Sequence, residues 1–227
     1  MAEVQKDGLV GYWSFDEGQG TTAYDGSGKG NDGTLNNFDW NANSGWITGK
    51  YNGALQFDGT DDYVDSGNRA SLNPSSITIS MWLYLASNPN CDANNNWRSL
   101  LHKGITCCTT TGYDIIMEEG RNVAWDTGNN GGDRWWPSGV SIPIGQWTQL
   151  VLTFDSTGMK KAYQDGLFKD SKTVAASSIT PNANNLWINN PSVACPNGDG
   201  NFNGIIDDVK IYNKALTPDD TINLKAA

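Results

Sequence analysis

Acidic residues stand near both ends of this chain, in segments suited to binding a hard cation. Near the C-terminus, Asp207, Val209 and Ile211 alternate onto one face of the predicted strand Gly204–Tyr212. A carboxylate on such a face must find a partner or stay in water. Far upstream, the segment 16–33 is rich in Gly, Asp and Asn, and loops of this kind supply the oxygen ligands that calcium prefers. We therefore expect the two ends of the chain to meet and a calcium ion to join them.

The carboxylates lack the spacing that glycoside hydrolysis requires. That chemistry needs carboxylates clustered on one face, with a pair roughly 5–5.5 Å apart in retaining enzymes. Glu118 and Glu119 are adjacent and would point to opposite faces of a strand. His102 is the sole histidine, and we expect it to satisfy a local hydrogen bond rather than to join a Ser-His-Asp set. The sequence therefore predicts no enzymatic activity.

The 10 tryptophans fall into two groups. Four occupy apolar strand segments and are expected to be packed, namely Trp13, Trp82, Trp147 and Trp187. The other six have no such assignment, and it is improbable that all of them are core residues: Trp40, Trp46, Trp97, Trp125, Trp135 and Trp136. The alternative for each ring is that it fills a gap beneath a long loop.

The predicted hairpin 121–139 contains most of the ligand-binding candidates. Trp136 aligns with Val140 and is predicted to face inward, so Trp135 faces outward. An outward indole beside amides and charges suits a sugar, because the ring stacks on the apolar face of a pyranose and the polar groups bond its hydroxyls. The predicted ligand-binding residues are Trp135 first, then Trp97 with Arg98, and with them Trp125, Asp126, Asn129 and Arg134.

All four cysteines, Cys91, Cys107, Cys108 and Cys195, lie in polar segments rich in turn residues. An even number of cysteines in loops favours disulfides and an oxidising compartment. The adjacent Cys107 and Cys108 are expected to bond to Cys91 and Cys195 in either order. A strained bond between the two neighbours, or free thiols, are the alternatives. A metal site is less favoured, because there is no Cys-x-x-Cys pair.

Composition and charge favour a secreted protein. The net charge of −10 argues against a nucleic-acid partner, which would need basic patches. No apolar run approaches the roughly 20 residues that span a bilayer, so no membrane insertion is expected. The first residues show no signal peptide, which suggests a module excised from a larger protein of the cell surface or the extracellular space.

The chain is expected to form one all-β domain over residues 1–227, with two packed antiparallel sheets. Short apolar segments alternate with turn pairs such as Asp58-Gly59 and Asp165-Gly166. The predicted strands are 9–15, 53–58, 63–66, 76–86, 99–103, 113–118, 121–126, 135–141, 146–155, 160–164, 186–189 and 204–212. One short helix is expected from Thr217 onward, where Thr caps and Pro218 occupies the first turn.

Segments in this order resemble the laminin G-like/concanavalin A-like lectin and glucanase superfamily, in particular its LamG-like jelly-roll modules. The resemblance spans nearly the whole chain and is carried by 12–35, 54–64, 77–82, 100–104, 145–155, 163–166 and 204–216. It implies a jelly-roll sandwich with a convex and a concave sheet. Family members often bind carbohydrate as non-catalytic modules, and many hold one calcium near the joined termini.

The resemblance also implies a set of calcium ligands. Asp16, Asp25 and Asp207 match acidic positions of the family motifs, and Gly33 or Asn31 would add an oxygen. The alternative is that Asp16 caps a turn and Asp25 forms an Asx-turn. A calcium ion at these positions would be structural.

The sequence thus predicts a non-catalytic, lectin-like module that binds a glycan or polysaccharide, with a structural calcium and with other modules of a parent protein as further partners. The alternative is an adhesive surface module with a protein partner or with no ligand of its own.

Overall fold

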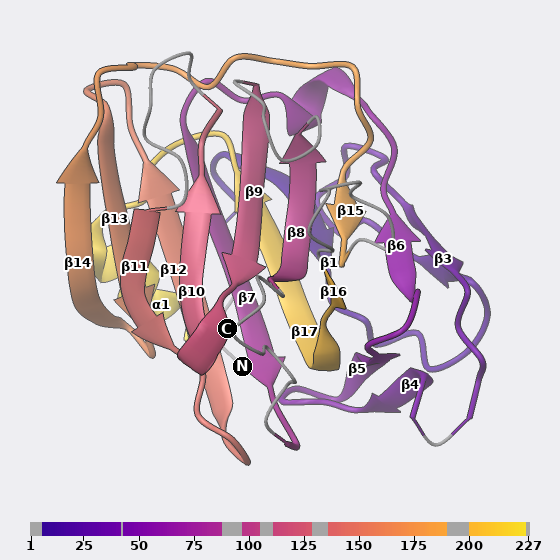
Figure 1. Ribbon diagram of the computed structural model, residues 1–227. Coiled ribbons are helices and arrows are strands. Elements are labelled where there is room, and N and C mark those ends of the chain that lie inside the picture. The colour runs from indigo at the N-terminus through magenta and orange to yellow at the C-terminus, as the bar shows by residue number, and fades with distance from the viewer. Residues whose placement is uncertain are drawn as a thin grey trace.

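The computed structural model describes residues 6–41, 43–87, 97–104, 111–128, 136–189 and 200–225. Within these residues, two β-sheets pack face to face (Figure 1). In the first, eight-stranded sheet the strands run in the order β14-β13-β12-β7-β17-β5-β4, with β1 paired to β17. The second, nine-stranded sheet has the order β11-β10-β9-β8-β15-β6-β3-β2, with β16 paired to β8. All the pairings are antiparallel except that of β16 with β8.

The strands of the two sheets have the following bounds. The eight-stranded sheet consists of β1 (Leu9–Trp13), β4 (Gly45–Thr48), β5 (Gly53–Asp58), β7 (Ile77–Tyr84), β12 (Trp147–Phe154), β13 (Met159–Gln164), β14 (Leu167–Thr173) and β17 (Asn203–Tyr212). The nine-stranded sheet consists of β2 (Thr22–Ala23), β3 (Gly33–Asn36), β6 (Tyr63–Asp65), β8 (Arg98–Gly104), β9 (Gly112–Met117), β10 (Asn122–Asp126), β11 (Trp136–Ser141), β15 (Trp187–Ile188) and β16 (Gly200–Asn201). The all-β, two-sheet prediction is confirmed.

Each of the twelve predicted strands is present, with ends that differ by a few residues. The prediction missed β2, β3, β4, β14 and β16. β14 was missed because it is an edge strand: its sequence, Leu-Phe-Lys-Asp-Ser-Lys-Thr, is almost entirely exposed and does not alternate. The predicted helix is α1 (Pro218–Asn223), which begins after the capping residue Thr217. None of the described helices is long and apolar enough to cross a membrane.

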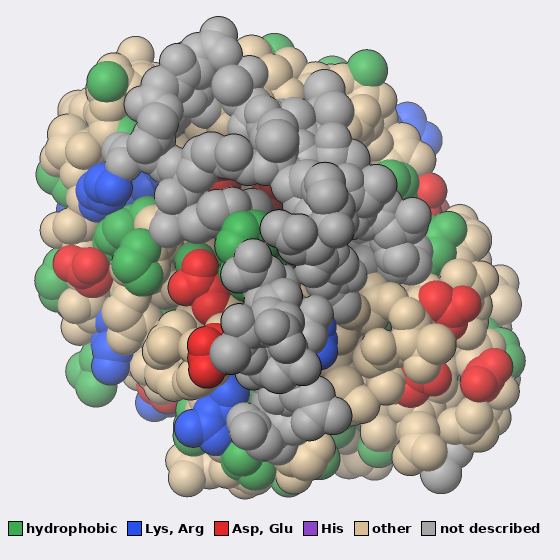
Figure 2. All heavy atoms as spheres, viewed as in Figure 1, with side chains coloured by type: hydrophobic (Ala, Val, Ile, Leu, Met, Phe, Trp, Pro, Cys, Tyr) green, Lys and Arg blue, Asp and Glu red, His purple; other side chains and the backbone are tan. Residues whose placement is uncertain are grey.

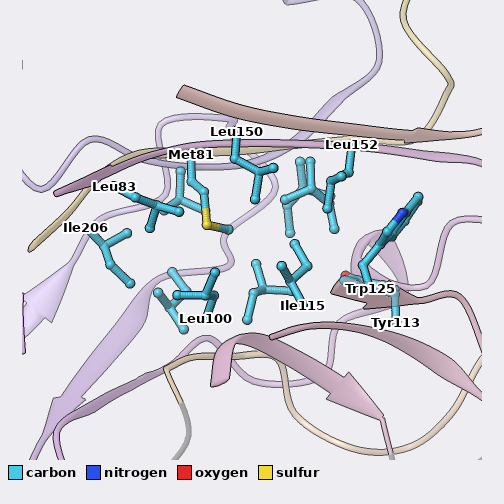
Figure 3. Packing of buried hydrophobic residues seen from close by; sticks show 14 of the residues in the cluster. Met81, Leu83, Leu100, Tyr113, Ile115, Trp125, Leu150, Leu152 and Ile206 are labelled. Carbon is cyan, nitrogen blue, oxygen red and sulfur yellow. The ribbon is translucent and has the colours of Figure 1, made fainter. Parts of the chain in front are cut away.

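One hydrophobic core fills the space between the two sheets (Figure 3). Met81, Leu150 and Leu152 enter it from the eight-stranded sheet, and Ile115 and Trp125 enter it from the nine-stranded sheet. A second, smaller cluster lies on the other side of the eight-stranded sheet, where Leu224, just past the end of α1, packs near Tyr212 and Val151. Both faces of the eight-stranded sheet are therefore buried at its centre.

The four tryptophans expected to be packed do not share one environment. Trp13 is buried in the core between the sheets. Trp82 is also buried, but it lies on the opposite side of its sheet, where Tyr51 packs edge-on against it and the Lys50 ammonium lies 4.8 Å from its ring centre. Trp147 and Trp187 are only half-buried, so the core prediction is wrong for both of them.

A bulge in β17 changes which residues share a face. The pairing of β17 with β7 shifts register between Asp207 and Lys210, and Asp208 has a φ of 55°. Ile206, Val209 and Ile211 therefore point into the core, while Asp207 lies opposite Trp82 on the outer side. The expectation that Asp207, Val209 and Ile211 share a face is wrong, because the extra residue moves Asp207 to the other side.

Candidate ligand-binding face

A row of polar and aromatic side chains crosses the outer face of the nine-stranded sheet. Val64, Ile188, Leu101, Ile115 and Trp125 are core residues on five adjacent strands. Their neighbours along each strand must point the other way. These neighbours lie opposite one another in register and form what we call the outer row: Asp65, Trp187, His102, Asp114 and Asp126.

The centre of the outer row is held by ring stacking and by a short contact between an imidazole nitrogen and a carboxylate oxygen. The rings of His102 and Trp187 are stacked, with centroids 5.7 Å apart and planes 13° from parallel. Tyr63 approaches Trp187 edge-on from β6, at 6.3 Å between centroids. His102 Nδ1 lies 2.7 Å from Asp114 Oδ1, which also accepts a hydrogen bond from the Lys103 amide. The two rings and one carboxylate are therefore fixed relative to one another.

The two ends of the outer row carry carboxylates. On β6, Asp65 accepts hydrogen bonds from the Asn185 amide group and from the Gly67 backbone N–H. On β10, Asp126 lies directly opposite Asp114 of β9. Side chains at such paired positions have Cβ atoms about 4.5–5.5 Å apart. Figure 2 views the molecule from the side of this sheet, and acidic side chains reach the surface at several places on it.

The nearest lysine belongs to the interior rather than to the outer row. Lys103 follows His102 on β8, so its side chain points inward, where it is fully buried. Its ammonium group donates to Asn68 Oδ1 at 2.8 Å and to the Asn184 carbonyl at 2.7 Å. Burial lowers the pKa of Lys103 to about 8. This charge is used to hold two loops together and does not face the carboxylates of the outer row.

The structure corrects part of the predicted ligand-binding set. Trp125 is fully buried in the core and does not face a ligand, because its strand turns Ala124 and Asp126 outward instead. The inward orientation predicted for Trp136 is confirmed. Asp126 lies in the outer row, where it is buried. Trp97 and Arg98 lie at the start of β8, and the Arg98 guanidinium donates to the Trp97 carbonyl. Trp135, Asn129 and Arg134 lie outside the described residues.

Sequence reasoning missed most of the outer row. Trp187 was assigned to the core because it stands between Leu186 and Ile188, although alternation allowed it to face outward. His102 was expected to make a local hydrogen bond, and its partner Asp114 is twelve residues away on the next strand. Asp65, Asp114 and Asp126 are far apart in the sequence, and only the strand register brings them into line. The sequence signal that could have located these residues is the polar residue that alternates with apolar residues in each strand.

The predicted calcium ligands do not form one site. Both oxygens of Asp25 are occupied by protein donors, which are the N–H groups of Tyr12, Ser27 and Asn31 and the Ser27 hydroxyl. Asn31 is buried, with its amide donating to the Val10 carbonyl and its side-chain oxygen accepting from Ser71. Gly33 pairs with Ala23 in the nine-stranded sheet and packs against Val64. Among the described residues, no group of three or more Asp, Glu, His or Cys side chains could hold a metal ion.

Asp16 and Asp207 instead share a structural role. The Asp207 carboxylate accepts hydrogen bonds from the amides of Lys50 (2.8 Å) and Tyr51 (3.0 Å), and Asp16 accepts one from Gly53 (2.9 Å). Both acids therefore fix the turn between β4 and β5. Asp207 Oδ1 is buried without a hydrogen-bond partner, and burial raises the pKa of this carboxyl group to about 7. Asp25 forms the Asx-turn that was the alternative interpretation. The cysteines Cys91, Cys107, Cys108 and Cys195 lie outside the described residues.

Comparisons with known proteins agree with this architecture. Residues 58–221 match the laminin G-like family described as the concanavalin A-like lectin/glucanases superfamily. No match is found among curated proteins. Domain 4 of AbnA, an extracellular arabinanase from Geobacillus stearothermophilus, in complex with arabinotriose, superposes with a TM-score of 0.67 at 22% identity, covering 97% of this chain and 100% of that chain.

Two further structures share the fold. The binding domain of Paraclostridial Mosquitocidal Protein 1 superposes with a TM-score of 0.71 at 17% identity, covering 97% of this chain and 52% of that chain. Trypanosoma rangeli sialidase, in complex with sialic acid, gives a TM-score of 0.66 at 17% identity, covering 96% of this chain and 32% of that chain. At these identities the similarity shows the fold alone. This chain corresponds to only a part of each of these two larger chains.

Proposed function

Because the chain belongs to the concanavalin A-like lectin/glucanases superfamily, we propose that it is a non-catalytic module that binds a glycan through the outer row. The observation that carries this proposal is the alignment of Asp65, Trp187, His102, Asp114 and Asp126 on five adjacent strands. The likeness to an arabinanase domain solved with arabinotriose supports a saccharide as the ligand class.

The chemistry of the outer row suits a saccharide. A sugar presents apolar C–H surfaces and a ring of hydroxyl groups, so its site needs an aromatic element with hydrogen-bonding groups beside it. The stacked rings of Trp187 and His102 supply a rigid apolar centre. Asp65 on one side and Asp114 with Asp126 on the other supply acceptors for hydroxyl hydrogens. Rigid side chains also reduce the entropy that binding costs.

One observation keeps hydrolysis as a second candidate. Asp114 and Asp126 face each other across β9 and β10, and a retaining glycosidase needs a carboxyl pair roughly 5–5.5 Å apart. Against catalysis, Asp114 is already engaged by His102 and by the Lys103 amide, which leaves it poorly placed to act as a nucleophile or as an acid. We therefore favour binding alone. Incubation with arabinan, galactan and xylan should release no reducing ends, and release that Asp126→Asn abolishes would establish hydrolysis instead.

The proposal also covers the location of the protein, a structural calcium ion and the disulfides. Extracellular placement is supported by the arabinanase likeness and by the acidic composition. The structural calcium and the disulfides remain predictions from the sequence. Thermal melting in calcium and in chelator tests the calcium ion, and intact-mass measurement after alkylation without reduction tests the disulfides.

Affinity electrophoresis through gels that contain arabinan, galactan, xylan or mixed-linkage β-glucan tests the binding proposal. At least one polysaccharide should retard the wild-type protein. Trp187→Ala should raise the dissociation constant at least about tenfold, as truncation of a central aromatic residue commonly does. The matched control is Trp40→Ala, because Trp40 is another partly exposed tryptophan, 48% accessible and outside the outer row. Equal affinity of Trp187→Ala and wild type would exclude this site. Absence of any retardation would favour the adhesive-module alternative.

A further inference from the structure

We infer that Lys103 is a positioning residue for the outer row, and that its buried ammonium group supports glycan binding while it carries its charge. The inference rests on the proposed function and adds the regulation of that site. Lys103 reaches no ligand itself, because its side chain points into the sandwich and is fully buried. It acts through two segments, 65–68 and 182–187, which contain Asp65 and Trp187.

The strand that presents Trp187 is too short to be fixed by pairing alone. β15 consists of two residues and lies between β6 and β8 in the nine-stranded sheet (Figure 1). Such a strand makes few ladder hydrogen bonds, so the residues that precede it must contribute to its position. Asn184 precedes Trp187 in this segment, and its backbone carbonyl accepts a hydrogen bond of 2.7 Å from the Lys103 ammonium group. The position of Trp187 therefore depends on a contact made inside the sandwich.

Lys103 also joins this segment to the end of β6. Its ammonium group donates to Asn68 Oδ1 at 2.8 Å, and Asn68 follows Asp65 in the loop after that strand. The Asp65 carboxylate in turn accepts a hydrogen bond of 3.0 Å from the Asn185 side chain. One ammonium group on β8 therefore holds the segments that carry Asp65 and Trp187 relative to each other.

Side-chain amides complete the link between the two segments. The Asn182 side chain donates to the Lys103 carbonyl at 2.9 Å. The Asn73 side chain donates to Asn68 Oδ1, and its oxygen accepts from the Asn182 backbone N–H. The two segments and β8 therefore form one connected hydrogen-bond network that includes the buried ammonium group.

The surroundings of the ammonium group favour loss of its proton in mildly alkaline solution. Its acceptors on Asn68 and Asn184 are neutral, and burial lowers the pKa of Lys103 from 10.5 to about 8. Titratable or charged described residues on the neighbouring elements and on the facing sheet are His102, Tyr113, Asp114, Asp65, Arg69 and Lys160. Tyr113 directs its hydroxyl to the Leu72 carbonyl, and the Lys160 ammonium group lies over the Trp125 ring.

Loss of this charge should weaken binding without weakening the fold. A charge-assisted hydrogen bond is roughly twice as strong as a neutral one, so deprotonation loosens both segments. Ordering loosened side chains then opposes binding. The sign for stability is opposite. The folded-state pKa of Lys103 lies below the unfolded value of about 10.4, so the unfolded chain binds more protons between about pH 8 and pH 10.4. Lys103 therefore makes stability rise with pH in the window where it makes affinity fall.

The indole N–H resonance of Trp187 reports the position of β15 without any ligand. Two-dimensional ¹H–¹⁵N spectra would be recorded between pH 6.5 and pH 9.5. In the wild type the resonance should titrate with a midpoint near pH 8. Lys103→Met keeps the length of the side chain without its charge and should abolish this titration, which separates it from any titration of the stacked His102 ring. A titration that persists unchanged in Lys103→Met would overturn the inference.

Asn68→Asp provides a second test that keeps the lysine. The variant retains the acceptor oxygen and adds a carboxylate beside the ammonium group, which favours the charged form. The midpoint of the Trp187 titration should therefore move upward by about one pH unit or more. A midpoint that stays at the wild-type value would show that a group other than Lys103 controls the position of Trp187.

Calorimetric titration at pH 7 and pH 9.5 measures the effect on binding, with oligosaccharides of the polysaccharide that retards the protein most. The wild-type dissociation constant should rise at least about threefold at the higher pH, and Lys103→Met should show the raised value at both. Lys29→Met removes an exposed lysine outside the network and should match the wild type at both.

Two results would overturn the inference while glycan binding stands. One is equal wild-type affinity at the two pH values, and the other is wild-type affinity of Lys103→Met at pH 7. If no oligosaccharide binds, the proposed function has failed and the effect on binding falls with it. The Trp187 titration then still decides whether Lys103 positions the outer row.

Discussion

At the scale of single residues, Asp207 is a buried carboxyl group that should make stability depend on pH. Burial is the largest cause of its raised pKa of about 7, and the nearby Asp208 and Asp16 raise the pKa further, while the amides of Tyr51 and Lys50 lower it. The unfolded chain should titrate near the ordinary value of about 3.9. Between these two values the folded state binds more protons, so stability must fall as the pH rises through this window.

The test measures urea unfolding at pH 5 and pH 8 in the presence of a chelator, which prevents a cation from replacing the proton. The free energy of unfolding should decrease toward pH 8 by an amount on the order of 3 kcal/mol. Asp207→Asn should remove most of that decrease, because an amide has no proton to lose and keeps an acceptor for the Lys50 and Tyr51 amides. If the free energy of unfolding decreases by the same amount in the variant and in the wild type, groups other than Asp207 control the pH dependence of stability.

Single residues also show what the sequence could predict and what it could not. The inward direction of Trp136 was predictable, because it alternates with Val140 on a regular strand. The direction of the Asp207 side chain was not predictable, because the sequence shows only an ordinary Asp-Asp pair at the position of the bulge. The outer row was hidden for a different reason: its members come from five strands, and their alignment depends on a register that only the folded chain defines.

At the scale of elements, the cap of α1 should anchor the second hydrophobic cluster. Thr217 accepts a hydrogen bond from the Asp220 amide, and the Asp220 carboxylate accepts one from the Thr217 amide, which completes a capping box. Thr217→Ala should lower the free energy of unfolding by about 1 kcal/mol, measured by urea unfolding. Thr217→Ser keeps the hydroxyl and is the matched control. A loss of the same size in both variants would point to packing of the threonine methyl group rather than to the cap.

At the scale of the whole molecule, one core unites both sheets, so the described chain should unfold as a unit. The core runs from Val10 in β1 to Ile211 in β17, and these two strands pair with each other. Calorimetry should show a single transition with equal calorimetric and van't Hoff enthalpies. Trp13→Ala leaves a cavity at a fully buried site where the two ends of the chain meet. It should lower the free energy of unfolding by about 3–5 kcal/mol while the single transition is kept. Two separate transitions would contradict the single-domain prediction.

The central claim is that a glycan binds at the outer row, and the indole N–H resonances of the tryptophans test it most directly. A two-dimensional ¹H–¹⁵N spectrum would be recorded while oligosaccharides of the retarding polysaccharide are added, with the Trp187 signal assigned by Trp187→Phe. We predict that the Trp187 resonance moves with saturation while those of Trp13 and Trp40 stay in place. Movement confined to Trp40, or no movement of Trp187 at saturation, would contradict the account.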